Sequence, residues 1–455
     1  MENQKSLNMF HEMPISQAVL KNALPAMAAM LMVLVYNLAD TFFIGQTKDA
    51  LQMAAVSLGT PVFLMFMSVG TVFGVGGTSV ISRALGEGKK EYAKKVCSFC
   101  MWCCIVIGIV MAGLFLIFMD DLLRMIGASS DTWDYAKTYL TICTIAGPFA
   151  LISSCFSNVI RTEGQATKAM AGQILGNVIN MLLDAILIVG FHLDIFGCAL
   201  ATLVGESVGA VYYLLFYLRK QSTLSISVKD FTAKEQVASS VLSIGIPAAL
   251  ASVLMSVSQI LINAQMAHYN DMAVAGMGVA MKVVMITGMI SMGLGQGVQP
   301  LLGYCVGSRE WKRFKGILRY SMGFAAILGT VMTLFCYLFN TQIVGVFLTE
   351  PDSANYAISF SRILLSTGVL FGVFYVLSNA LQAMGAAFSS LIINLSRQGL
   401  IYIPALFLLQ AAFGIYGLAW AQPVADVLSF LIAVILYFVT LRVTIQNSLE
   451  YVGKK

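Results

Sequence analysis

The stretch NALPAMAAMLMVLVYNLADTFFIG, residues 22–45, is a mostly apolar run that ends shortly after a carboxylate, Asp40. An α-helix needs about 20 apolar residues to cross the hydrocarbon core of a bilayer, so this run predicts a membrane-spanning helix. A charged side chain deep in such a helix costs roughly 2.5 to 3.5 kcal/mol on insertion scales. Asp40 therefore needs a partner or a function.

The rest of the chain repeats this apolar pattern. Of the 455 residues, 58% are hydrophobic and only 11% are charged, whereas soluble domains carry about 25% charged residues. Since backbone groups inside a bilayer must pair within the protein, helices are expected to do the spanning. The composition predicts an all-α integral membrane protein with twelve transmembrane helices, at residues 22–45, 54–82, 96–119, 136–158, 169–191, 196–218, 238–267, 273–304, 316–339, 358–383, 389–411 and 415–441.

The basic residues orient these helices. Most of the 27 Lys and Arg fall in alternate loops, as in the cluster Lys89, Lys90, Lys94 and Lys95, on the side that also holds the N-terminus. Cytoplasmic loops are enriched in such residues. We therefore expect a multi-pass protein of a prokaryotic plasma (inner) membrane with both termini in the cytoplasm. The polar residues 1–14 lead directly into the first span and do not resemble a cleaved signal peptide.

The chain contains an internal repeat. LPAMAA at 24–29 aligns with IPAALA at 246–251, and SNVIRTEG at 157–164 aligns with SNALQAMG at 378–385. Because each half has an even number of spans, the halves share one orientation and are expected to be related by a pseudo-twofold axis along the membrane normal. The predicted organisation is a six-helix N-terminal lobe (1–218), a cytoplasmic linker (219–237) and a six-helix C-terminal lobe (238–455). Duplicated bundles of this kind are typical of transporters that alternate access by rocking.

Two further motifs are interpreted as structural. The stretch CSFCMWCC at 97–104 lies in an apolar run without neighbouring His or carboxylate, which favours small buried thiols over a metal site. Gly74, Gly76 and Gly77, with counterparts Gly295 and Gly297, are typical of closely packed membrane helices.

Several polar side chains converge in depth on the predicted topology. Asp40, Asp184 and Thr202 come from three helices and lie about 8 to 10 Å below the outer boundary, at 1.5 Å per residue. Asn180 lies one turn from Asp184 on the same helix face. Because no Lys or Arg is predicted at this level, the set favours a reversible ion site. Its oxygens suit Na⁺, and two poorly hydrated carboxylates suit a proton carrier, so both coupling ions stay open.

The second half differs in its charged residues. Lys282, Arg397 and Asp426 are predicted near mid-depth, where we interpret them as a structural salt-bridged cluster. Asp426 is the repeat counterpart of Glu206. Glu206 itself is open to two interpretations, a deeper proton site or a packing role.

The motifs together resemble a known family. The LAD of the first span, RALGEG (83–88), RTEG (161–164) and the N-x-x-x-D pattern that ends at Asp184 are similar to those of the multidrug and toxic compound extrusion (MATE) transporters, closest to the DNA-damage-inducible branch. The resemblance covers essentially the whole chain. It implies a secondary antiporter in which coupling residues bind H⁺ or Na⁺ and a proline, here Pro25, bends the first helix. The implied coupling residues, which would also be the metal ligands for Na⁺, are Asp40, Asn180, Asp184 and Thr202.

The resemblance also implies the transported compounds. They are organic, often cationic and amphipathic, and the candidate cavity residues are Tyr36, Asn37, Met67 and Asn158. Tyr36 offers a ring for cation–π contact. We expect small drug-like partners in a lipid bilayer, no nucleic acid, a monomer, and no cofactor other than the coupling ion.

Three other functions are considered. A lipid-linked oligosaccharide flippase of the same superfamily is the main alternative, although only two basic residues lie inside predicted spans. A membrane enzyme is not expected, because the three His lie near span ends and build no catalytic constellation. A channel would conduct without ion-coupled uphill movement.

Overall fold

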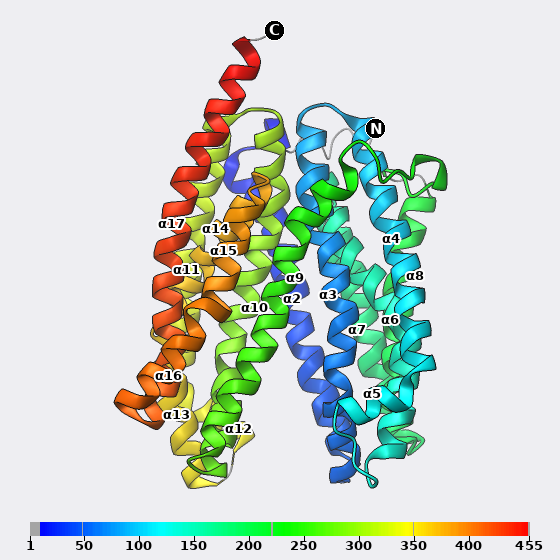
Figure 1. The fold of residues 1–455 in the computed structure, drawn as a ribbon, viewed down its shortest axis with the longest axis vertical. Helices are drawn as coiled ribbons and strands as arrows, with labels where there is room; N and C mark the ends of the chain where they lie inside the picture. The colour runs from blue at the N-terminus through cyan, green and yellow to red at the C-terminus, as the bar shows by residue number, and fades with distance from the viewer. Residues whose placement is uncertain (1–9, 48, 220–221, 349, 454–455) are drawn as a thin grey trace. The chain divides into compact units, whose positions relative to one another are not determined.

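The computed structural model describes residues 10–47, 49–219, 222–348 and 350–453, with side chains described up to residue 446 except at residue 50. Figure 1 shows that the chain is built of long helices. Within the described residues, eleven helices are long and apolar enough to cross a membrane, or up to twelve if a bent helix pair counts as one span. The predicted all-α membrane fold is therefore confirmed. The outermost parts of the two termini, residues 1–9 and 454–455, lie outside the described residues.

The helices of the first half follow the predicted spans closely. The half contains two short segments, α5 (Met119–Met125) and the 3₁₀ turn η1 (Ile160–Glu163). Its long helices are α2 (Ile15–Gly45), α3 (Ala50–Gly86), α4 (Lys90–Ile117), α6 (Trp133–Val159), α7 (Ala166–Asp184) with the π-helix η2 (Ala185–Gly190), and α8 (Asp194–Leu218).

The helices of the second half are interrupted more often than those of the first half. Helices α13 (Pro351–Leu365) and α14 (Gly368–Ala383) form the bent pair, with an angle of 48°. The 3₁₀ turn η3 (Val228–Asp230) precedes this half. Its other elements are α9 (Val237–Ala267), α10 (Asp271–Gly307), α11 (Trp311–Leu338), α12 (Asn340–Phe347), α15 (Ala387–Leu395), the π-helix η4 (Ser396–Leu400), α16 (Tyr402–Phe413) and α17 (Ile415–Gly453).

Capping residues start the second helix of each half. The Asp49 carboxylate accepts a hydrogen bond from the Leu51 backbone N–H at 2.9 Å before α3. The Asn270 side chain accepts from the Ala273 N–H at 2.7 Å before α10. Both satisfy a backbone donor that the first helical turn leaves unpaired. The two halves thus share a side-chain cap at the start of the equivalent helix.

The chain divides into two compact units whose boundaries fall inside helices. One unit comprises Met1–His11 and Leu31–Gly245, and the other Glu12–Met30 and Ile246–Lys455. Helix α2 therefore contributes its first part to the second unit and its remainder to the first. Helix α9 contributes its first part to the first unit and its remainder to the second unit.

Glycines explain how these helix segments pack within each unit. In the first unit, a Cβ atom on Gly76 of α3 would collide with the backbone of Val241 in α9. In the second unit, a Cβ on Gly297 of α10 would lie 2.6 Å from the Cα atom of Ala23 in α2. Small residues let helix backbones approach in this way. The packing role predicted for these glycines is confirmed.

Candidate ion-coupling site

The site begins where α7 and α8 pack closely in the first unit. A Cβ on Gly205 would lie 2.8 Å from the Cβ of Asn180, so only glycine permits this separation. The close approach lets the Asn180 Nδ2 donate a hydrogen bond to the Thr202 Oγ1 at 3.4 Å. Both side chains are buried. Thus Asn180 and Thr202, both predicted as coupling residues, are in contact.

A third helix, α2, supplies Asp40. The Cys198 thiol donates to the Asp40 Oδ1 at 3.4 Å, and the Thr202 hydroxyl donates to the Cys198 carbonyl at 3.1 Å. One carboxylate oxygen each of Asp40 and Asp184 and the sulfur of Cys198 all lie within 4.8 Å of one another. The structure therefore brings together all four residues predicted from depth.

Asp184 is the least satisfied member of the group. Its side chain is 0% exposed, and among the described residues neither carboxylate oxygen has a hydrogen-bond partner. The same is true of the Asn180 Oδ1. A buried polar group without a partner costs about 1 to 3 kcal/mol, and more when it is charged. These orphaned oxygens fit a bound proton or a hard cation.

Cys198 is the member that the sequence analysis missed. It lies one turn before Thr202 on α8, and this four-residue spacing was a signal that could have found it. A thiol is a soft ligand that suits neither Na⁺ nor other hard cations. Its role in this geometry is that of a weak hydrogen-bond donor to Asp40.

The polar face of α7 continues away from the site. Asn177 and Gln173 follow Asn180 at intervals that keep them on one side of the helix. The Asn177 Nδ2 and the Gln173 Oε1 are also buried without a hydrogen-bond partner in the described part of the chain. Glu206, one turn beyond Thr202 on α8, is half-buried.

The four cavity candidates lie in different settings. Tyr36 is half-buried one turn before Asp40 on α2, and Met67 is half-buried on α3. Asn37 is exposed, and its amide donates to the Val33 carbonyl at 2.9 Å. Asn158 is held within α6 by a bond to the Ser154 carbonyl at 3.0 Å. A role in lining a cavity stays a prediction for all four.

Pro25 lies inside α2, which continues as one helix from Ile15 to Gly45. Within its own unit it belongs to the segment Glu12–Met30. Its half-buried ring occupies a position where proline removes a backbone donor and weakens the helix locally. Bending at this point stays a prediction.

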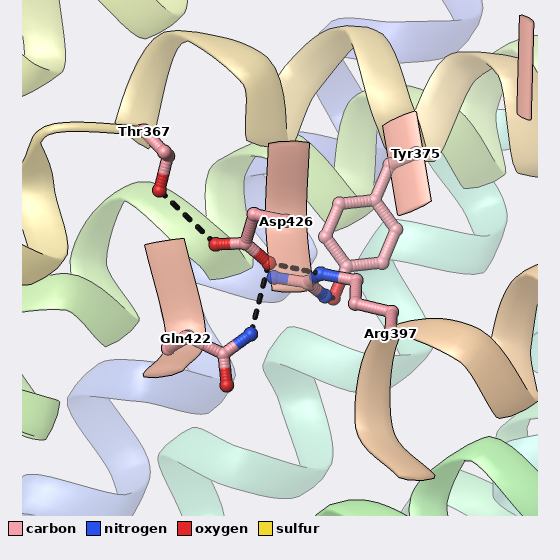
Figure 2. A network of polar contacts seen from close by, with 5 residues as sticks. All are labelled: Thr367, Tyr375, Arg397, Gln422 and Asp426. Atoms are coloured by element: carbon pink, nitrogen blue, oxygen red, sulfur yellow. Dashed lines mark hydrogen bonds and ion pairs between the residues drawn. The ribbon is translucent and has the colours of Figure 1, made fainter. Parts of the chain in front are cut away.

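The second unit contains the predicted ion pair. The Arg397 Nε donates to the Asp426 Oδ1 at 2.8 Å, and the two side chains are 11% and 2% exposed (Figure 2). Lys282 is not part of this group, contrary to the prediction. Its ammonium lies instead 5.3 Å from the centroid of the Phe347 ring.

A duplicated set of long apolar helices, with two carboxylates close together inside one unit, is typical of membrane transporters built from repeated bundles. The MatE family matches residues 25–186 and again residues 247–408, which confirms the internal repeat. The chain therefore belongs to the MatE family and is a multi-span membrane transporter.

Similar proteins agree with this assignment. The chain is 31% identical over 442 residues to the multidrug export protein MepA of Staphylococcus haemolyticus, covering 96% of this chain and 97% of that protein. It is 29% identical over 445 residues to MepA of Staphylococcus aureus, covering 98% of each. These relatives are export proteins, not enzymes.

Solved structures show the same fold. A MATE transporter in the straight conformation has a TM-score of 0.90 at 22% identity, covering 97% of this chain and 98% of that chain. An outward-facing multidrug resistance MATE family transporter has the same TM-score and identity, with the same coverage. The architecture of two six-helix lobes is therefore confirmed. The predicted placement in the DNA-damage-inducible branch stays a prediction.

Proposed function

We propose that this protein is a secondary active antiporter that exports organic, often cationic and amphipathic compounds in exchange for H⁺ or Na⁺. Relatives of nearly the same length are multidrug export proteins. The observation that carries the proposal is the cluster of Asp40 and Asp184 within 4.8 Å. Neither carboxylate has a Lys or Arg partner among the described residues.

The carboxylate pair couples ion binding to transport. Two negative charges about 5 Å apart repel by about 3 kcal/mol at an effective dielectric constant near 20. Uptake of one H⁺ or one Na⁺ relieves this repulsion, and Asn180 and Thr202 add neutral oxygens that suit Na⁺. The coupling site therefore needs no cofactor besides the ion.

Ion binding acts on the organic cation and on the helix. The doubly charged pair attracts a cationic compound, and a bound ion removes that attraction, so release follows ion entry. Helix α2 carries both Asp40 and Pro25. Because a proline is a common site of helix kinks, a change of charge at Asp40 acts on a helix that can bend at Pro25. The bound ion must stabilise the two conformations unequally, since otherwise it drives nothing. We further propose a monomer in a prokaryotic plasma membrane with both termini cytoplasmic.

The test uses purified full-length protein in liposomes loaded with ethidium, a fluorescent organic cation. Gradients of pH and of Na⁺ are imposed separately, and ethidium movement is followed. Wild type is expected to move the dye uphill with one of the gradients. Asp40→Asn, which keeps the side-chain shape, is expected to lose this coupling while inserting normally. Coupled transport in that variant, or a leak independent of both gradients, would refute the proposal.

A further inference from the structure

A cavity lies at the break between α13 and α14, within the unit that does not carry the coupling site. It has a volume of about 400 Å³, which falls in the range of pockets that hold small molecules, about 300 to 1,000 Å³. Residues of α11, of α17 and of the last turn of α13 line it. Leu365 and Ser366, at the point where the helix pair bends by 48°, are among them.

The cavity lies near the ends of the helices that line it. Tyr337 comes one residue before α11 ends at Leu338, and Trp420 follows the start of α17 at Ile415 by about 8 Å at 1.5 Å per residue. The two side chains are 48% and 43% exposed, so the cavity is reached from the surface. Tyr and Trp are enriched where membrane helices meet the lipid headgroups. The cavity therefore lies near that boundary, opposite the cytoplasm in the proposed orientation.

Arg362 is the charged residue of the lining. The carbon at the centre of its guanidinium lies 5.5 Å from the centroid of the Tyr337 ring, a cation–π contact that helps to position it. None of the ion pairs within the described ranges includes Arg362. The lining residues include no carboxylate. Because the planar guanidinium matches the oxygens of a phosphate, Arg362 is placed to bind a phosphate in the cavity.

Thr333 supplies a second donor. Threonine in a helix can donate to the carbonyl four residues earlier, as Thr330 does to Ala326 at 2.7 Å on the same helix. The Thr333 Oγ1 instead is buried and has no hydrogen-bond partner in the described part of the chain. It lies against the start of α14, where a Cβ on Gly368 would collide with it. This hydroxyl is therefore available to a ligand oxygen.

The remaining walls are mostly apolar. They are formed by Ile363 and Leu365 of α13 and by the Trp420 ring. A free inorganic anion buries no apolar surface against such walls, whereas a phospholipid carries its phosphate directly beside apolar chains. Since no lining carboxylate pairs with the ammonium of a zwitterionic headgroup, the charge of the lining is complementary to a lipid with net negative charge.

We propose that this cavity binds an anionic glycerophospholipid of the type of phosphatidylglycerol. Arg362 and Thr333 donate to the phosphate oxygens, and the apolar walls contact the glycerol and the first carbons of the acyl chains. A lipid in this position contacts α11, α13 and α17 together. The site is a binding site for a membrane component and does not depend on which ion drives export.

The test uses purified full-length protein in lipid nanodiscs, with Trp420 as a local reporter. Bromine atoms on acyl chains quench the fluorescence of nearby tryptophan, and the share of Trp420 is the difference between a protein and its Trp420→Phe variant. The nanodiscs contain brominated phosphatidylglycerol or brominated phosphatidylcholine at the same mole fraction. We expect phosphatidylglycerol to bind beside Trp420 about fivefold more tightly, which is the factor that one arginine near an anionic lipid contributes.

Two substitutions test the donors. Arg362→Gln removes the charge, so the preference for phosphatidylglycerol at Trp420 is expected to disappear. Arg362→Met, which keeps an apolar stem, replaces it if the glutamine variant does not fold. Thr333→Val keeps the side-chain shape without the hydroxyl and is expected to weaken the binding of phosphatidylglycerol about twofold or more.

Arg124→Gln is the matched control. Arg124 is an exposed arginine of α5 that the predicted topology places on the same side of the membrane, and it does not line the cavity. Its loss is expected to leave the quenching of Trp420 unchanged. An excess of inorganic phosphate is also expected to have no effect, because the free anion has no chains to contact the apolar walls.

Four results would overturn the proposal. They are equal quenching by the two lipids in the wild type, a preference that survives Arg362→Gln or Arg362→Met, a loss of preference in Arg124→Gln, and displacement of the lipid by inorganic phosphate. The measurements involve no ion gradient. The lipid site and the Asp40 coupling site can therefore fail separately.

Discussion

At the scale of single residues, Asp40 and Asp184 differ in the hydrogen bonds that their carboxylates accept. Asp40 accepts a hydrogen bond from Cys198, whereas both oxygens of Asp184 lack a hydrogen-bond partner within the described ranges. A carboxylate that is buried without donors costs free energy in its charged form. Asp184 therefore carries the larger penalty of the pair, and it gains most from a bound ion.

This difference predicts the behaviour of Asp184→Asn. The amide keeps the shape and removes a buried charge that has no ion-pair partner, so thermal unfolding in detergent is expected at the wild-type temperature or above it. Gradient-driven ethidium transport in liposomes is expected to fall by at least about tenfold, because one charge no longer repels the other. A variant that is unstable and inactive would point to a structural role for Asp184.

Cys198 predicts the ion preference of the site. Cys198→Ser replaces a soft sulfur by a hard hydroxyl oxygen, which suits Na⁺. We expect ethidium transport driven by a Na⁺ gradient to rise relative to transport driven by a pH gradient. Cys198→Ala removes the donor to Asp40 without adding an oxygen and serves as the control. Equal Na⁺ dependence in the serine and alanine variants would show that position 198 does not face the ion.

At the scale of helices, the distance between α7 and α8 determines whether the site forms. A Cβ on Gly205 would lie 2.8 Å from the Cβ of Asn180 and 2.9 Å from the Gly176 carbonyl oxygen, and a Cβ on Gly176 would lie 2.8 Å from the Gly205 carbonyl oxygen. The hydrogen bond from Asn180 to Thr202 is already 3.4 Å long, so a small separation breaks it. The glycines thus have a functional as well as a packing role.

Gly205→Ala tests this dependence. A Cβ at 2.8 Å from Asn180 forces the helices apart, with an expected loss of about 1 to 3 kcal/mol of stability. Gly113→Ala on α4 is the matched control, since a Cβ there has nothing within 4 Å, and alanine favours helix by up to about 1 kcal/mol. We expect thermal unfolding of the first variant to shift downward and that of the second to stay or rise. Reduced transport is expected only for Gly205→Ala.

At the scale of the whole molecule, the linker is fastened to the first unit. The Glu163 carboxylate accepts bonds from the Thr223 N–H and hydroxyl at 2.6 Å and from the Ser222 hydroxyl at 2.7 Å. Farther along, the Trp102 Nε1 donates to the Ile226 carbonyl at 3.1 Å. Residues 222–226 of the linker are therefore held against that unit, and changes of conformation are expected in the helices instead.

Glu163→Gln is expected to loosen this part of the linker. The neutral amide accepts weaker hydrogen bonds than a carboxylate, which bonds about twice as strongly as a neutral acceptor. Trypsin cleavage after Lys229 and Lys234 is expected to speed up in the variant, measured on purified protein by fragment size. Lys95→Ala, which removes an exposed ion pair with Glu235, is the control with little expected effect. Unchanged cleavage in Glu163→Gln would show that the other contacts hold the linker by themselves.

The sequence predicted the features that depend on local pattern. Apolar runs located the spans, and depth counted along straight helices placed Asp40, Asp184 and Thr202 together. Cys198 was missed because a thiol within an apolar run is usually a buried core residue. The π-helices and the fastened linker depend on tertiary packing, which no local pattern reports. Lys282 was assigned to the Arg397 pair by depth alone, although depth does not give the direction in which a side chain points.

The division of α2 and α9 between the units makes the two halves of the sequence depend on each other. Residues 12–30 complete the second unit, and the start of α9 completes the first, so each unit borrows a segment from the other half of the gene. Neither half of the sequence therefore contains all of one unit. Chains cut at the linker are therefore expected to regain transport when the two fragments are co-expressed, while either fragment alone lacks part of its own core.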